Sequence, residues 1–199
     1  EIKPWTHFRR KAKPYSNQKK SYTRFFDSSI HDRPIDADNR SRFGDFEGDT
    51  IYGSVGKGYL VTGIDRRSRL LIAAKCEDKT IPVINQAFKQ AFSKLPDVIK
   101  PLTLTLDNGT EFLGFKDIEK ENDLTVYFAD SHSPWQRGSN ENINGLIRFF
   151  FPRGTDFRNL PQEQLDSVVA LINNRPRKGL GDLSPIEFIN KSVALGLTI

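Results

Sequence analysis

A chain of 199 residues, 37% of them hydrophobic, can bury one good core and a small appendage. Its mean hydropathy is −0.53, and no apolar run approaches the ~20 residues that would span a membrane, which excludes a membrane-spanning protein. One cysteine, Cys76, excludes a disulfide framework, and three histidines are too few to favour a Cys/His zinc site.

The positive charge is concentrated at the N-terminus. Residues 1–25 hold eight of the 30 Lys and Arg side chains but one of the 25 acids, so the rest of the chain is slightly acidic. A solvated leader is one interpretation. We favour an arm along a polyanion, because aromatic residues are interleaved with the cations and disordered tails are poor in aromatics. The cations of the arm that we predict to contact DNA are Arg9, Arg10, Lys11, Lys13, Lys19 and Lys20.

The first part of the chain divides into an arm and a run of strands. Residues 1–40 have few periodic apolar positions and are expected to form a basic extended linker or arm, with the folded core over residues 41–199. Strands are predicted at 46–52, 59–65 and 70–76, joined by a glycine-rich loop and a polar turn. Three consecutive antiparallel strands are the simplest arrangement.

The second part alternates helices and strands. An apolar stripe from Ile84 to Leu95 predicts a helix, with Thr80 as its cap and Pro82 in its first turn. Ser184 and Glu187 have the spacing of a capping box at the last helix. The order of elements predicts an α/β fold with a mixed sheet of about five strands. Strands are expected at 102–107 and 124–129, and helices at 115–121, 139–151, 161–174 and 185–194.

Three acids are candidates for a common site, and two of them stand at strand positions, which disfavour acids and make burial of a bare carboxylate costly. Asp49 lies within the first strand, Asp107 ends the fourth, and Glu141 begins a helix. If the first and fourth strands are neighbours, the two aspartates meet, and a helix across the sheet could add Glu141. Glu47, on the same strand face as Asp49, is the acid that could take its place. Surface or capping acids remain the alternative, and Glu111 is interpreted as a first-turn helix acid.

Three carboxylates without His or Cys form an oxygen-rich site suited to Mg²⁺ or Mn²⁺. Two such ions can clamp the attacking and leaving oxygens of a displacement at phosphorus. We therefore predict two ions held by Asp49, Asp107 and Glu141. A glycosidase could also use paired carboxylates, but the basic arm and the lack of a sugar-stacking aromatic cluster near the acids disfavour it.

The sequence around these acids resembles the IS30 family of bacterial insertion-sequence transposases. The blocks that carry the likeness are Gly44–Asp49, Asp107–Phe112 and Ser133–Gly145, with Asn173–Lys178 and Leu183–Pro185 similar to the family's closing block. The likeness extends over about residues 41–190. It implies a ribonuclease-H-like fold of the retroviral integrase type.

The resemblance also implies the chemistry and the partners. The family's Asp-Asp-Glu triad falls on Asp49, Asp107 and Glu141, and Mg²⁺-dependent strand cleavage and strand transfer at inverted-repeat ends would follow, without a covalent protein–DNA intermediate. Double-stranded DNA, a homodimer or higher multimer, and a location at the nucleoid in the bacterial cytoplasm are expected. The alternatives are a related nuclease that cuts without joining and a catalytically silent DNA-binding derivative.

Residues near Glu141 are candidate DNA contacts. Arg148 lies two helical turns beyond Glu141 on the same face, where a cation could reach a phosphate, although an ordinary surface arginine would also fit. Asn144 lies at the intermediate step. Trp135 could stack on a splayed base or pin its own loop to the body. The other predicted DNA contacts are Gln136, Arg137, Asn140, Arg175, Arg177 and Lys178.

Overall fold

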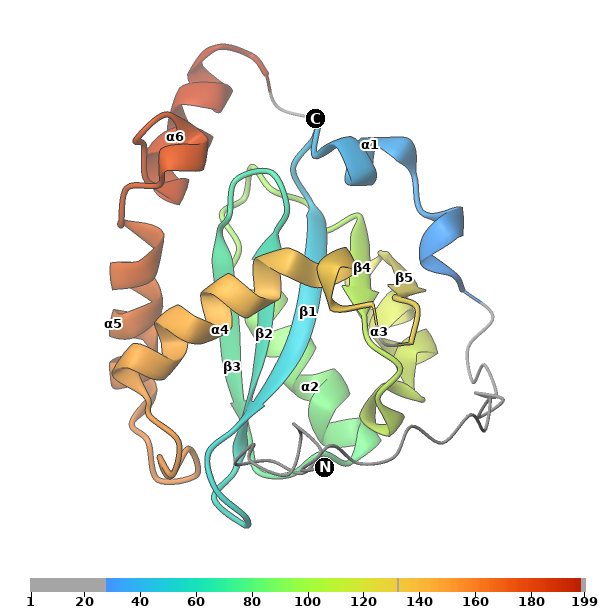
Figure 1. Cartoon of the computed structure of the whole chain (residues 1–199), viewed down its shortest axis with the longest axis vertical. Coiled ribbons are helices and arrows are strands. Elements are labelled where there is room, and N and C mark those ends of the chain that lie inside the picture. The colour runs from blue at the N-terminus through green and yellow to red at the C-terminus, as the bar shows by residue number, and fades with distance from the viewer. Residues whose placement is uncertain (1–27, 132, 198–199) are drawn as a thin grey trace, which may run out of the picture.

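The computed structural model describes residues 28–131 and 133–197, and it places them around one sheet with helices on both faces (Figure 1). The predicted contacts in the basic arm and His132 lie outside these residues. The five strands are β1 (Asp45–Tyr52), β2 (Tyr59–Asp65), β3 (Leu71–Cys76), β4 (Thr103–Leu106) and β5 (Thr125–Phe128).

The sheet is mixed, as predicted, with strand order β3-β2-β1-β4-β5. The first three strands are antiparallel neighbours, while β1 pairs with β4, and β4 with β5, in parallel. The central strand β1 therefore joins the antiparallel half to the parallel half. This neighbourhood of β1 and β4 is the condition under which Asp49 and Asp107 were expected to meet.

The α-helices are α1 (Ile35–Asn39), α2 (Ile81–Phe92), α3 (Phe115–Asn122), α4 (Gly138–Phe150), α5 (Gln162–Asn173) and α6 (Pro185–Ala194), with short 3₁₀ turns η2 (Ile30–Asp32), η3 (Thr110–Phe112), η4 (Pro134–Arg137) and η5 (Lys178–Leu180). The helices α3 to α6 begin and end within one residue of the predicted positions, α2 ends three residues before the end of the predicted stripe, and α1 lies in the segment that was expected to be extended. Ser184 and Glu187 form the predicted capping box, each side chain accepting the other's backbone N–H. Thr80 precedes its helix, but its hydroxyl bonds Asp78 and caps nothing, which corrects that expectation.

Alternation along the strands gives the sheet two apolar faces. Phe46 of β1 packs with α2, α3 and Ile189 of α6, whereas Ile51 packs on the opposite face with α4 and α5. Gly48 is required by packing, because a Cβ there would lie 2.7 Å from Leu106 Cδ2. The helix α4 crosses the face of the sheet to which Ile51 points (Figure 1), so the odd-numbered positions of β1 lie under it.

Residues 28–40 differ from the expected extended arm. The backbone of Ser29 bridges to Phe128 of β5, and Ile30 and Ala37 are buried. The guanidinium of Arg33 donates to the Thr105 hydroxyl at 2.9 Å. The packed body thus begins before Ser41. Single apolar residues that pack on an edge strand leave no periodic pattern, and for this reason the sequence did not indicate them.

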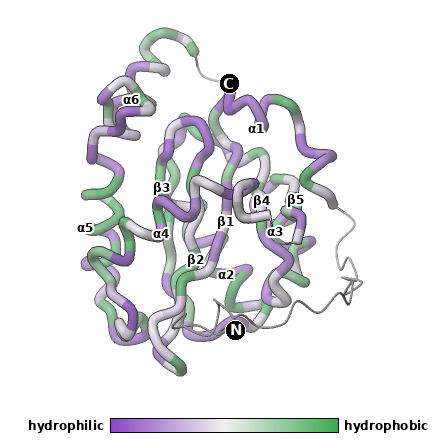
Figure 2. The backbone as a smooth tube through the Cα atoms, viewed as in Figure 1, coloured by the Kyte–Doolittle hydropathy of each residue, from purple (hydrophilic) through white to green (hydrophobic). Residues whose placement is uncertain are grey.

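Hydrophobic and hydrophilic residues alternate along α5, which covers the sheet on the same side as α4 (Figure 2). The other helices are also short and amphipathic. Among the described residues, no helix combines the length and apolar character needed to cross a membrane.

Candidate active site

Three acids project from one face of β1, at alternate positions. Asp45 and Glu47 are fully buried. Asp45 binds Arg42 and the Thr103 hydroxyl. Asp49 keeps 22% of its side chain exposed. Of the three, only Asp49 can meet a ligand from solvent.

Glu47 is occupied by structural contacts. Its carboxylate forms a buried ion pair with Arg66 and accepts the Ser139 N–H at 3.0 Å and the Ser139 hydroxyl at 3.1 Å. These bonds fix the first turn of α4 over the sheet. The sequence could not separate Glu47 from Asp49, because alternation gives both the same face; the start of α4 assigns them different roles.

Asp107 lies beside Asp49. The parallel register pairs Glu47 with Thr105, and two residues further it brings Asp49 opposite Asp107. The Asp107 side chain is 41% exposed. The two carboxylates therefore open together at the carboxyl end of β4, where sequence reasoning expected them.

A guanidinium lies between the two carboxylates. Arg137 Nη2 is 3.0 Å from Asp107 Oδ2, and Nη1 is 3.8 Å from Asp49 Oδ1. Nη1 also donates to the Gly48 carbonyl at 3.2 Å. The sequence predicted Arg137 as a DNA contact; the structure places it as the counter-ion of the acid pair.

The pKa of Asp49 is subject to opposing effects. Burial raises its pKa above the usual range, while Arg137, the Thr50 N–H and the Asn144 side chain act in the opposite direction. Asn144 Nδ2 donates to Asp49 Oδ2 at 2.7 Å. This hydrogen bond supports the predicted role of Asn144 as an orienting residue on the α4 face.

Glu141 lies in the first turn of α4, exposed, one helical turn before Asn144. The helix thus presents Glu141 toward the side that meets Asp49. The structure does not bring it into a cluster with the two aspartates: in the described ranges, no three His, Cys, Asp or Glu side chains lie close enough to hold a metal ion. Two of the three predicted ligands are together, and the third is on the adjoining helix.

Glu111 extends the acidic region. Its carboxylate accepts the Thr50 hydroxyl at 3.1 Å and pairs with Lys79 at 2.6 Å. Burial opposes its ionisation, but these hydrogen bonds keep its pKa below the ordinary value. Its position in the 3₁₀ turn after Asp107 agrees with the first-turn interpretation, and its side chain also reaches the neighbour of Asp49.

The other predicted DNA contacts fall into different surroundings. Trp135 is 75% exposed, so it does not pin its loop to the body. Gln136 binds Asp130 through both its amide oxygen and its nitrogen. Asn140 is buried and donates to the Gly48 carbonyl. Arg148 lies at the end of β1, where Nη2 donates to the Tyr52 carbonyl at 2.6 Å and burial lowers its pKa.

The acid pair is suited to a hard cation. Two carboxylates that share one guanidinium form an oxygen donor set with a local demand for positive charge. Asp49 and Asp107 therefore fit Mg²⁺ or Mn²⁺ by donor chemistry and by partial exposure. Arg175, Arg177 and Lys178 lie elsewhere, in the segment that follows α5, with η5 beginning at Lys178.

The chain is similar to known proteins in sequence and in fold. Residues 39–134 match the integrase core domain family. The chain is 41% identical over 166 residues to "Transposase InsI for insertion sequence element IS30A" of Escherichia coli (strain K12), an alignment that covers 83% of this chain and 43% of that one. It is 38% identical over 168 residues to "Transposase for insertion sequence element IS1086" of Cupriavidus metallidurans, covering 83% and 49%. The chain thus spans less than half the length of these curated relatives.

Solved structures show the same fold. The catalytic core domain of BIV integrase superposes with a TM-score of 0.58 at 17% identity, covering 76% of this chain and 96% of that one. The HTLV-2 integrase catalytic core domain, solved in complex with magnesium, superposes with a TM-score of 0.54 at 22% identity, covering 72% and 93%. The mixed five-stranded sheet flanked by helices is therefore that of retroviral integrase catalytic cores, as the sequence predicted.

Proposed function

The chain belongs to the IS30 type of transposases with an integrase core domain, and from this premise we propose that it catalyses metal-dependent cleavage and strand transfer at the inverted-repeat ends of an insertion sequence. The observation that carries the proposal is the pair Asp49 and Asp107 on neighbouring parallel strands, sharing the guanidinium of Arg137. Both carboxylates are partly exposed, so a ligand from solvent can reach them together.

Asp49, Asp107 and Glu141 would hold the metal, two ions per site being the expected number. Bound Mg²⁺ or Mn²⁺ would supply the positive charge that a phosphoryl transfer requires. The HTLV-2 core, a protein of the same fold, is solved with magnesium. Glu141, on a helix anchored by Glu47, would complete the donor set when α4 or its side chain adjusts.

The chain's own residues would position the reacting strand. Asn144 donates to one oxygen of Asp49 and the Thr50 N–H donates to the other, so the two bonds hold the carboxylate in place, and each oxygen keeps a further lone pair for the ligand. Arg137 offsets one of the two negative charges of the acid pair and would move away when a metal enters. Arg148 and the exposed Trp135 flank this region and are the proposed contacts to phosphate and base.

The proposed partners follow from the family. Double-stranded DNA is the substrate, and the basic arm with Arg9, Arg10, Lys11, Lys13, Lys19 and Lys20 would raise its non-specific affinity. A homodimer or higher multimer on DNA is expected, and the HTLV-2 core is solved in dimeric and trimeric forms. The bacterial cytoplasm, at the nucleoid, is the proposed location.

The test is an assay of cleavage and joining on a duplex that ends in the element's terminal repeat, with Mg²⁺, Mn²⁺, Ca²⁺ or EDTA. Joined product should require Mg²⁺ or Mn²⁺ and fall by about a hundredfold or more in Asp49→Asn, Asp107→Asn and Glu141→Gln. The matched control is Asp123→Asn, an exposed C-cap acid far from the site whose positive φ an asparagine tolerates. Binding should persist in all four variants.

Other outcomes select the alternatives. Cutting without joining would identify a ribonuclease-H-like nuclease, and binding without either reaction would identify a silent derivative. Full joining by all three triad variants would refute the assignment of the acids. Loss of activity in Asp123→Asn as well would show that the effect is not specific to the triad.

A further inference from the structure

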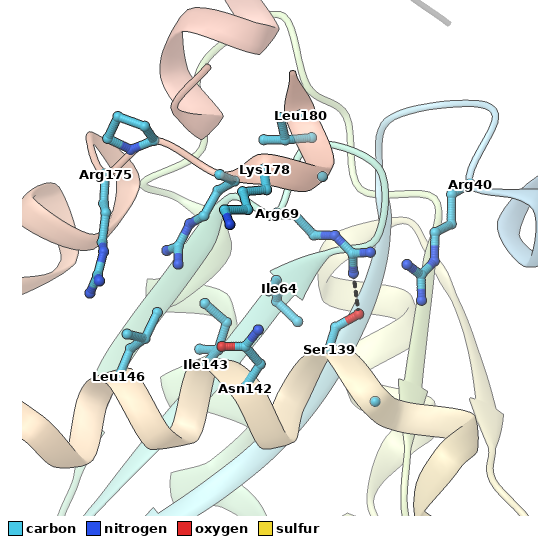
Figure 3. Close-up of a pocket in the computed structure, with 14 residues that line it drawn as sticks. Arg40, Ile64, Arg69, Ser139, Asn142, Ile143, Leu146, Arg175, Lys178 and Leu180 are labelled. Atoms are coloured by element: carbon cyan, nitrogen blue, oxygen red, sulfur yellow. Dashed lines mark hydrogen bonds between the residues drawn. The ribbon is translucent and has the colours of Figure 1, made fainter. Parts of the chain in front are cut away.

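A cavity of about 650 Å³ lies on the other side of α4 from the acid pair. One wall is the helix itself, through Asn142 and Leu146; the opposite wall is the segment of residues 175–180 (Figure 3). Arg175 and Arg40 lie toward its two ends in this view. Ile64, Ile143 and Leu180 make part of its lining apolar.

The charge of this cavity, which we call the cationic pocket, has one sign. Its lining holds five basic residues and no carboxylate. In the part of the chain that the structure describes, none of the five forms an ion pair. Many cations elsewhere in the described residues do pair with an acid, so five neighbouring cations without one form an unusual group. The five are Arg40, Arg69, Arg175, Arg177 and Lys178.

The cations are held close enough to repel one another. Burial lowers the pKa of Arg69, and the charge of Arg40 lowers it further, although Glu47 and Asp65 act in the opposite direction. Burial and then the charge of Arg175 lower the pKa of Arg177. The Nε of Arg177 is buried without a hydrogen-bond partner among the described residues. An anion in the pocket would relieve both the repulsion and the unpaired donor.

Two of the arginines occupy backbone positions that suit glycine. Arg40 has φ 56° and Arg69 has φ 63°, in the left-handed region where a side chain is strained. The Arg69 side chain donates a hydrogen bond to the Ser139 hydroxyl at 2.6 Å (Figure 3). For Arg40 the described residues provide no side-chain hydrogen bond, so no structural contact explains why an arginine stands there.

We propose that the cationic pocket binds a phosphate of the DNA backbone, as a second DNA site separated from the acid pair by α4. The cations would neutralise the phosphate, and the apolar lining would take the deoxyribose carbons. Taking DNA as the partner rests on the proposed function. The pocket brings Arg40 and Arg69, far away in sequence, together with the three cations of the closing block.

The test is DNA affinity measured by fluorescence anisotropy over a range of salt concentrations, in EDTA, with the full chain and a short duplex of arbitrary sequence. Arg175→Gln/Lys178→Gln removes two exposed cations of the pocket. It should weaken binding about tenfold and reduce the salt slope by roughly 0.9 for each phosphate that is no longer neutralised. Lys120→Gln/Lys191→Gln removes the same charge outside the pocket and should change affinity less than about twofold.

Arg40→Gly separates binding from folding. Glycine relieves the left-handed strain, so the thermal midpoint should rise while DNA affinity falls. A structural role for Arg40 would instead lower the midpoint. Inorganic phosphate is the second probe, and in the proposal it should compete with the duplex in the wild type and not in the double variant.

Several results would overturn the pocket. Equal losses of DNA affinity in the pocket and control variants would show that only the net charge matters. Unchanged affinity and salt slope in the pocket variant would show that the pocket does not bind DNA. Phosphate binding that depends on the pocket, with unchanged DNA affinity, would assign a free anion instead. Because binding is measured in EDTA, a chain that binds through the pocket but cannot cut refutes only the proposed function.

Discussion

The two sides of α4 face groups of opposite charge. On one side two carboxylates face a single guanidinium, that of Arg137. On the other side five cations face no carboxylate in their pocket. The first arrangement is partly neutralised within the chain and open to exchange of its cation; the second has no counter-charge in its lining and would be neutralised by an anion from outside. If both proposals hold, metal and backbone phosphate would bind on separate sides of one helix.

Both sides depend on the same anchor. Ser139, at the start of α4, binds Glu47 through its N–H and hydroxyl and also accepts a bond from Arg69 of the pocket. A buried acid of β1 therefore sets the position of the helix for the acid pair and for the cationic pocket alike. Changes at the anchor should disturb both sides, whereas changes beyond it should affect one.

The largest expected effect on stability is at Glu47. Glu47→Gln leaves Arg66 buried without its ion-pair partner and should cost about 3–5 kcal/mol of the free energy of unfolding, measured by urea denaturation at pH 7. Asp49→Asn, two residues along the same face, should cost less than about 0.5 kcal/mol, because burial already disfavours its charge. Equal losses in the two variants would show that the anchor and the acid pair are not distinct.

Arg137→Gln should have a smaller effect, seen in metal affinity. Removal of the guanidinium eliminates the cation that competes for Asp107 and Asp49, so Mn²⁺ should bind roughly two- to fivefold more tightly in calorimetry without DNA. Arg175→Gln removes the same charge from the pocket side and is the matched control. Weaker Mn²⁺ binding in Arg137→Gln would mean that this arginine organises the site rather than occupying it.

The smallest effect concerns pH and Glu111. Because its folded-state pKa is lowered, ionised Glu111 stabilises the fold above its unfolded value of about 4.3, and this contribution is lost as pH falls through the lower folded value. Glu111→Gln should cost less than about 1 kcal/mol at pH 7 and less still at pH 3. Urea midpoints at the two pH values measure the difference. An equal loss at both would assign the effect to packing, not to the Lys79 ion pair.

The order of strands and helices could be predicted because it depends on local periodicity. The apolar stripe in α2 and the alternation in β1 and β4 reflect burial on one face, and both patterns are visible in the sequence. Residues 28–40 escaped prediction because their few buried side chains, such as Ile30, pack against a distant edge strand. The contacts that join these residues to the body are non-local.

The candidate site was predictable only in part. Asp49 and Asp107 could be paired from the sequence because parallel neighbours place equivalent positions side by side. Glu141 was proposed from its place at the start of a helix and from the family resemblance, and it stays a prediction, since the described residues do not unite it with the aspartates. No sequence signal placed Arg137 between the carboxylates, because a side chain of that length reaches many positions from its loop.

The sequence by itself determined the sheet, the helices α2 to α6 and the family, and it singled out the acids that are proposed as metal ligands, because strand and helix periods and short motifs are local properties of the chain. Only the tertiary structure decided that Glu47 is an anchor and Asp49 an open carboxylate, since the difference depends on where α4 begins. It also decided that Arg40 and Arg69 join Arg175 in one pocket. Contacts between residues so distant along the chain are set by packing of the sheet and helices, and no local pattern records them.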